Sequence, residues 1–108
     1  MSSSREVKEI RNDAGELVAS FEYVDGKLDG VERLWINGTL VMEMQHVNGQ
    51  PHGEYKAWWD NGVPKQEGQF AHGKPIGKFR FYDETGELTE ERHLDLPSNT
   101  SLERTRER

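Results

Sequence analysis

The sequence predicts an all-β protein: a single-layer twisted antiparallel meander of about seven strands, built from β-hairpin repeats of 23–24 residues. Two observations lead to this fold. Glycines recur at fixed intervals, and only 32% of the 108 residues are hydrophobic, beside 31% that are charged. So polar a chain buries little core, yet its three Trp, three Tyr and four Phe are too many for a typical disordered chain. A thin, ordered sheet satisfies both conditions.

Three series of glycines set the repeat. Members of the first series are 23, 24 and 24 residues apart, the second series follows the first by 11 residues, and the third follows the second by 4. We interpret the glycines from Gly26 onward as turn residues and place Pro51 and Pro75 in the same turns, since both residue types favour turns. The Asn-Gly pairs at 37–38 and 61–62 suit type I′ hairpins. The three series are Gly15, Gly38, Gly62 and Gly86; Gly26, Gly49 and Gly73; and Gly30, Gly53 and Gly77.

The elements follow from the repeat in chain order. Residues 1–11 are expected to be disordered or to form an edge strand. Residues 12–96 form the repeat domain, with a half-repeat at 12–25 and full repeats at 26–48, 49–72 and 73–96. Each full repeat contains two strands, because glycine or proline interrupts every window long enough for a helix. Residues 97–108 are expected to be a polar tail or a short helix.

The repeat register predicts one face with a row of alternating charge. Opposite charges that face each other across strands stabilise a sheet by about 0.2–1 kcal/mol per pair. A second row on the same face is expected to run Val18, Trp35, Val41, Trp58, Lys65, Tyr82, Thr89. The candidate protein-binding residues of this face are its aromatic and basic side chains: Trp35, Trp58, Tyr82, Arg33, Lys56 and Arg80. The charged row itself runs Ser20, Arg33, Glu43, Lys56, Glu67, Arg80, Glu91.

The opposite face is predicted to be apolar. One of its rows is expected to set large side chains opposite glycines, in the order Tyr23, Gly30, His46, Gly53, Phe70, Gly77, Leu94. A single-layer sheet leaves this face open, so we expect a partner protein or a second copy to cover it. Both faces remain candidate interfaces at this point. The candidate interface residues of the apolar face are Phe21, Tyr23, Leu34, Met42, Met44, Tyr55, Trp59, Phe79 and Phe81.

Nothing in the sequence points to catalysis, and we predict no catalytic, cofactor or metal site. The chain has no cysteine, which excludes thiolate metal ligands and disulfides. His46 matches Tyr23 and Phe70 in the repeat, so it is interpreted as space-filling, while His52 and His72 fall in turns without the spacing of metal ligands. Glu43, Glu67 and Glu91 have basic neighbours that keep them ionised, unlike a general acid.

The net charge of the chain indicates which classes of partner it can bind. A net charge of −6 opposes binding to nucleic acid and to anionic lipid, and it favours a basic protein partner. We find neither an apolar run long enough to span a membrane nor a signal peptide, so a cytoplasmic location is expected.

Residues 12–94 resemble MORN repeats (membrane occupation and recognition nexus), in the 23–24 residue variant found in bacteria. The resemblance rests on the pattern Tyr-x-x-Gly-Lys-x-x-Gly followed by an aromatic-rich strand and Asn-Gly, as in residues 21–30, 47–62 and 70–82. It implies a hairpin meander without catalytic residues. It also implies a protein-binding function, most simply that of an antitoxin or immunity protein that masks a toxin. The alternatives are a self-associating scaffold or dimerisation module and, as the weakest, a phospholipid-binding protein.

Overall fold

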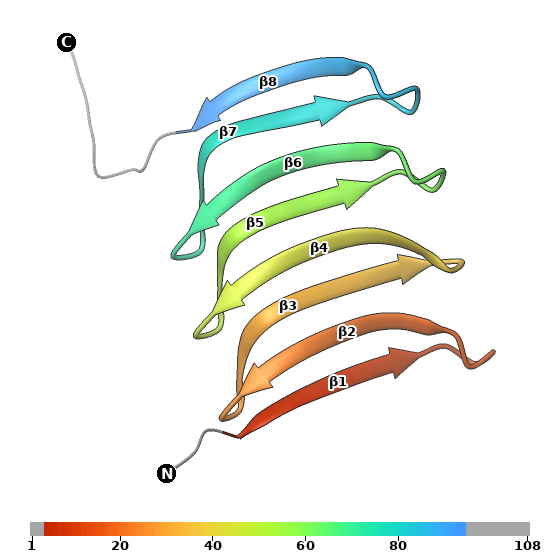
Figure 1. The fold of residues 1–108 in the computed structure, drawn as a ribbon, viewed down its shortest axis with the longest axis vertical. Helices are drawn as coiled ribbons and strands as arrows, with labels where there is room; N and C mark the ends of the chain where they lie inside the picture. Colours follow the sequence, from red (N-terminus) through yellow and green to blue (C-terminus); the bar gives the residue numbers. More distant parts are fainter. Residues whose placement is uncertain (1–3, 95–108) are drawn as a thin grey trace.

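A computed structural model describes residues 4–94 as one antiparallel sheet of eight strands in chain order (Figure 1). The predicted fold class, an all-β single-layer hairpin meander, is therefore confirmed. The strands are β1 (Arg5–Arg11), β2 (Leu17–Val24), β3 (Lys27–Ile36), β4 (Thr39–Val47), β5 (Gln50–Trp58), β6 (Pro64–Ala71), β7 (Lys74–Tyr82) and β8 (Leu88–Leu94).

The sheet has eight strands rather than about seven, because residues 5–11 form the edge strand β1. β1 pairs with β2 over its whole length, so the segment 12–25, predicted as a half-repeat, contributes the second strand of a complete hairpin. The tail predicted for residues 97–108 lies outside the described residues.

Two kinds of tight turn connect the strands. Four connections place both central residues at positive φ, as in Asn37-Gly38 with 50° and 82°, which is the type I′ geometry that matches strand twist. Asn61-Gly62 differs, and its assignment to a type I′ turn was wrong. There the N–H of Trp59 donates to the carbonyl of Val63 at 2.8 Å, and only the glycine has positive φ. This longer loop adds one residue, which explains the change from 23 to 24 residues between Gly26, Gly49 and Gly73.

Gly30, Gly53 and Gly77 are not turn residues, contrary to the sequence interpretation. They lie inside β3, β5 and β7, as do Pro51 and Pro75. Each glycine sits at a bulge: the β2–β3 register, for example, passes from Phe21↔Glu32 to Tyr23↔Leu28, so two additional β3 residues are accommodated. The glycines have φ values of 122°, 113° and 70°, which L side chains rarely adopt.

The predicted charged row is confirmed by the strand pairing. Ser20, Arg33, Glu43, Lys56, Glu67, Arg80 and Glu91 face one another in turn from β2 to β8. The aromatic row is wrong in its partners, because a second set of bulges lies beside the other turns. Trp35 faces Leu40, Trp58 faces Pro64 and Tyr82 faces Leu88, while the expected partners Val41, Lys65 and Thr89 are the additional residues of these bulges.

The predicted row of large residues opposite glycines is confirmed in part. Gly30 faces His46, Gly53 faces Phe70 and Gly77 faces Leu94. At the other predicted pairs of this row, the bulges change the partner. Tyr23 therefore faces Leu28, His46 faces Pro51, and Phe70 faces Pro75.

The small core lies on the apolar face. Ala19, Ala57 and Phe79 are its buried hydrophobic residues, and Phe79 is only 6% exposed. The Phe79 ring packs edge-on against Phe70, with centroids 5.8 Å apart, and covers Gly68, where an added Cβ would collide with it. Among residues 4–94 there is no second layer, and the shortest axis of the molecule is 18 Å.

Replacement of Phe79 tests this core. We expect Phe79→Ala to lower the free energy of unfolding by about 3 kcal/mol, because it removes a buried ring and uncovers Gly68. Urea denaturation measures the change. Leu88→Ala, at a side chain 49% exposed, is the control and should change stability by less than about 0.5 kcal/mol. Equal losses in the two variants would contradict a core centred on Phe79.

Candidate functional site

The apolar face has an apolar middle and charged ends. One row runs from Ala19 through Leu34, Met42 and Ala57 to Gln66 and Phe81, and the next includes Phe21, Met44 and Tyr55. At the ends, the ammonium of Lys8 on β1 lies 5.1 Å from the Tyr23 ring centroid, and the guanidinium of Arg92 on β8 lies 5.7 Å from that of Phe81. This arrangement resembles a protein interface, with an apolar centre and a polar rim.

Trp59, which was predicted to belong to this face, forms a hydrogen bond and a cation–π contact with residues around it. Its indole N–H donates to the carbonyl of Tyr82 at 3.1 Å, and the Lys65 ammonium lies 4.6 Å from its ring centroid. Asn61 also contacts the turn between β7 and β8, where its side-chain amide donates to the Glu84 carbonyl at 3.0 Å. Trp59 therefore joins consecutive turns, and less of it is available to a partner.

A histidine and a glutamate form a polar pair within the apolar face. Nε2 of His46 lies 2.9 Å from Oε1 of Glu32, and the two side chains are 7% and 19% exposed. Nδ1 of His46 is buried and has no hydrogen-bond partner among residues 4–94. The sequence interpretation of His46 as space-filling holds for its burial, but it missed Glu32, which reaches His46 from the neighbouring strand. In the described part of the chain, no third metal-ligating side chain joins this pair.

The charged face carries two ion pairs in its row. Nε of Arg33 lies 2.7 Å from Oε2 of Glu43, and Nε of Arg80 lies 3.0 Å from Oε2 of Glu91. Lys56 faces both Glu43 and Glu67 in register. Among residues 4–94, however, no carboxylate oxygen lies within 4.0 Å of its ammonium. The register therefore places opposite charges next to each other, and in the described part of this row Arg33 and Arg80 are the basic residues that form ion pairs.

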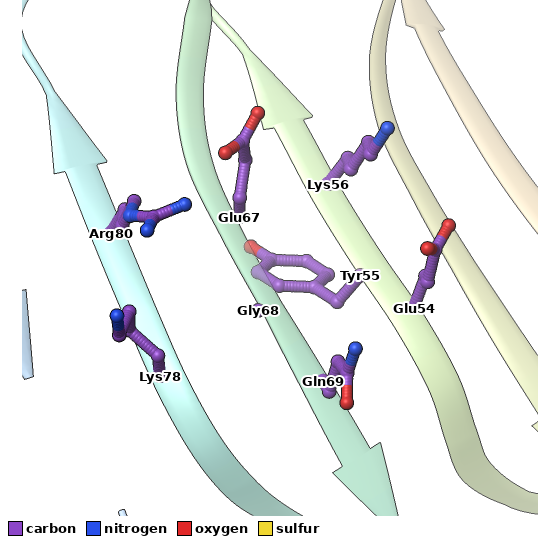
Figure 2. Close-up of a pocket in the computed structure, with 8 residues that line it drawn as sticks. All are labelled: Glu54, Tyr55, Lys56, Glu67, Gly68, Gln69, Lys78 and Arg80. Atoms are coloured by element: carbon purple, nitrogen blue, oxygen red, sulfur yellow. The ribbon is translucent and has the colours of Figure 1, made fainter. Parts of the chain in front are cut away.

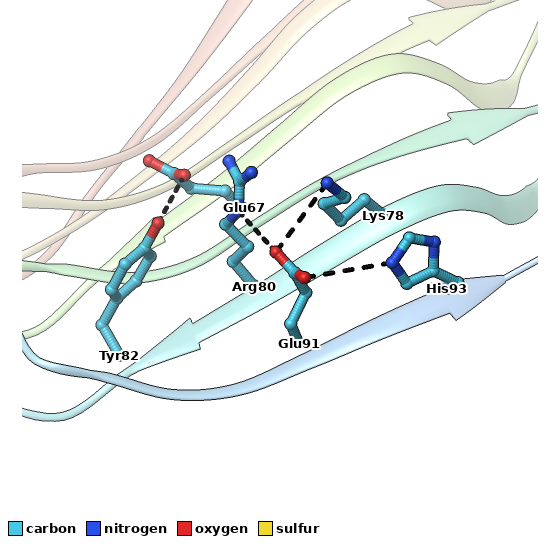
Figure 3. A network of polar contacts seen from close by, with 6 residues as sticks. All are labelled: Glu67, Lys78, Arg80, Tyr82, Glu91 and His93. Carbon is cyan, nitrogen blue, oxygen red and sulfur yellow. Dashed lines mark hydrogen bonds and ion pairs between the residues drawn. The ribbon is translucent and has the colours of Figure 1, made fainter.

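A polar network surrounds Glu91 near the C-terminal end of the sheet (Figure 3). Glu91 accepts a hydrogen bond from Arg80, which lowers the pKa of its carboxyl, and it lies 4.0 Å from the Lys78 ammonium. The Tyr82 hydroxyl donates to Glu67 at 3.1 Å, which places this aromatic residue on the charged face as predicted. Desolvation, followed by that hydrogen bond, raises the pKa of Tyr82.

A polar hollow of about 390 Å³ opens beside this network, between β5, β6 and β7 (Figure 2). Six of its lining residues lie at alternate positions of their strands and share the charged face, while Tyr55 and Gly68 lie between them in the chain. The sequence identified Lys56 and Arg80 as binding candidates but not the hollow. Its lining consists of Glu54, Tyr55, Lys56, Glu67, Gly68, Gln69, Lys78 and Arg80.

Two further histidines meet at one end of the strands. The rings of His52 and His72 lie 4.9 Å apart, and the backbone N–H of His72 donates to Nδ1 of His52 at 3.1 Å. Within residues 4–94, no three His, Asp or Glu side chains gather as a metal site. The same part of the chain contains no helix that is long and apolar enough to cross a membrane.

The lowered pKa of Glu91 predicts a pH dependence. A carboxyl whose pKa is lower in the folded state stabilises the fold above its unfolded pKa, and this contribution disappears as pH falls through the folded pKa. We therefore expect Glu91→Gln to lower the melting temperature at about pH 7, and we expect the difference from the wild type to shrink progressively as pH falls below about 4. Thermal denaturation across this range measures the difference. Glu87→Gln, in the preceding turn, is the control, and an equal effect there would contradict the pairing with Arg80.

The comparisons with known proteins agree with the repeat geometry. Residues 51–72 and 75–95 match the family model of the MORN repeat variant. No curated protein matches the chain, and no solved structure does. The matched segments cover the hairpins of β5–β6 and β7–β8, whose strands β5 and β7 carry an in-strand bulge as β3 does. The match supports a MORN-repeat protein, a kind of chain typical of binding and structural modules.

Proposed function

We propose that this protein is a non-catalytic module that binds a basic protein partner through the apolar face of its sheet. The observation that carries the proposal is that a one-layer sheet leaves this face without a covering layer among residues 4–94. Large exposed apolar patches mark interaction sites in soluble proteins. The two longer axes of the molecule, 56 and 47 Å, provide room for a standard interface of about 800 Å² per partner.

The side chains on this face suit such an interface. Phe21, Tyr23, Met44, Tyr55 and Phe81 are half-buried, so each still presents part of its surface. Aromatic residues and methionine are enriched at interfaces, and methionine adapts its shape to a partner. The face thus offers several anchoring side chains inside a rim of charge.

The partner is inferred to be basic because the chain has a net charge of −6. Complementary charge raises association rates and excludes partners of like charge. A small acidic module that covers a basic protein acts by occlusion. This is the mode of an antitoxin or immunity protein, and we propose that role for the chain.

Substitutions on the two faces test the interface. Affinity capture from the native host, followed by calorimetry with the purified partner, should yield a basic protein whose affinity falls about tenfold with Phe81→Ala. Trp58→Ala, a matched aromatic truncation on the charged face, should leave the affinity unchanged. If the affinity falls with Trp58→Ala but not with Phe81→Ala, the interface lies on the charged face instead. Capture of an acidic partner would refute the charge argument.

A self-associating scaffold is the second candidate, and the sequence of the edge strand supports it. All seven residues of β1 are exposed. Antiparallel pairing of two β1 strands about Val7 would set Arg5 opposite Glu9 and Glu6 opposite Lys8. Head-to-tail continuation of the charged row would instead set Glu91 of one copy against Glu9 of the next, which is repulsive.

Charge reversal distinguishes this candidate. If two β1 strands pair, light scattering should detect a dimer, which Glu6→Lys should weaken because it sets two lysines opposite each other. The double variant Glu6→Lys, Lys8→Glu restores complementary pairs and should restore the dimer. Arg92→Glu on the other edge strand is the control. A monomeric wild type, or a dimer unaffected by Glu6→Lys, would exclude pairing through β1.

A further inference from the structure

The first two in-strand bulges are each closed by a side chain from the preceding strand. At the first, Oε1 of Glu22 accepts a hydrogen bond from the backbone N–H of Val31 at 3.1 Å, and the side chain covers Gly30. At the second, Oε1 of Gln45 accepts from the N–H of Glu54 at 3.4 Å and covers Gly53. In both bulges a carboxylate or carboxamide oxygen satisfies the backbone donor after the glycine.

The third bulge is built from the same positions but is not closed. Gln69 occupies the position of Glu22 and Gln45, yet within residues 4–94 no heavy atom beyond the chain neighbours of Gly77 lies within 4 Å of a Cβ added there. Gly30 and Gly53 are half-buried, whereas Gly77 is exposed. Among residues 4–94, no side chain accepts a hydrogen bond from the N–H of Lys78, the equivalent donor. The register explains the change, because here the bulge begins one residue earlier, at the bare Gly68.

The hollow of the charged face lies at this open bulge. Three of its lining residues are cationic, namely Lys56, Lys78 and Arg80, and two are anionic, Glu54 and Glu67. Glu67 is already hydrogen-bonded to Tyr82, and the Glu43 carboxylate is already paired with Arg33. Arg80 is paired with Glu91 at 3.0 Å, and the Lys78 ammonium lies 4.0 Å from the same carboxylate. Among residues 4–94, Lys56 is therefore the cation of the lining that has no ion-pair partner, and it is available to a ligand.

We propose that this hollow binds a carboxylate group, which takes the role at the third bulge that the Glu22 carboxylate has at the first. Lys56 supplies the positive charge, Lys78 lies in the same lining and is shared with Glu91, and the side-chain amide of Gln69 donates a hydrogen bond. A single cation without an ion pair suits a monoanion, since Glu54 and Glu67 repel a more highly charged phosphate. The volume of about 390 Å³ admits a glutamate-sized side chain or a small organic acid.

The carboxylate can come from a small organic acid or from an acidic side chain of a protein segment. The site lies on the face opposite to the apolar interface proposed above. It therefore stands or falls independently of that interface, and the two are tested by different variants.

Titration of the isotope-labelled protein, monitored by NMR, tests the site. The probes are sodium acetate and a short peptide with one glutamate and blocked ends, each against sodium chloride at equal ionic strength and against phosphate. We expect saturable shifts of the Lys78 amide and the Gln69 side-chain amide with a carboxylate probe. Response to acetate identifies a small-acid site, and response to the peptide alone identifies a site for acidic protein segments. No saturable shift with either, or equal binding of phosphate, overturns the proposal.

Variants at matched repeat positions complete the test. Lys56→Gln and Lys78→Gln should each weaken binding about tenfold, whereas Arg33→Gln, the equivalent of Arg80 in an earlier repeat, should not change it. Gln69→Glu places an internal carboxylate at the position of Glu22 and should abolish binding, while Gln45→Glu at the closed bulge should have no effect. Folding of each variant is verified from its amide spectrum. Undiminished affinity in both lysine variants would contradict the assignment.

Discussion

Pairing between consecutive strands holds this protein together, because little else is available to do so. Ala19, Ala57 and Phe79 are the hydrophobic residues that the sheet buries among residues 4–94, and each strand packs chiefly on its neighbours in the sequence. The backbone ladder and its cross-strand side-chain pairs must therefore supply order that a thicker domain obtains from its core. Such a chain is nearly one-dimensional, and the stability of each hairpin depends on the hairpins beside it.

The repeat in the sequence predicted the strand pairing well, because side chains alternate with a period of two and a repeat preserves that parity. The charged row from Ser20 to Glu91 follows from this rule alone. The bulges could not be predicted in the same way. A glycine at positive φ serves a turn or a bulge equally well, so Gly53 carried the same signal as Gly49. The bulges beside the other turns then displaced the partners of Trp35, Trp58 and Tyr82.

Some features of the candidate site were likewise predicted from the sequence, and others were not. The two faces and their composition follow from alternation and were predicted, including Tyr82 on the charged face beside Glu67. The pairing of His46 with Glu32 was missed because both residues are exceptions to the apolar pattern of their face. Nothing in the repeat pattern links the two residues, and their contact depends on their positions on neighbouring strands. The hollow was missed for a different reason. It arises where the third repeat differs from the first two, at Gly68 and Gln69. A pattern that is recognised by what the repeats share does not indicate a position at which one repeat differs.

The thinness of the sheet has a mechanical consequence. Lys78 and Phe79 are adjacent in β7, yet one borders the hollow and the other is the buried ring of the opposite face. A thicker domain would insulate two such surfaces from each other with packed side chains, but here a single peptide plane separates them. Any rotation of that plane moves both residues at once, so the shape of one surface depends on the backbone that also shapes the other.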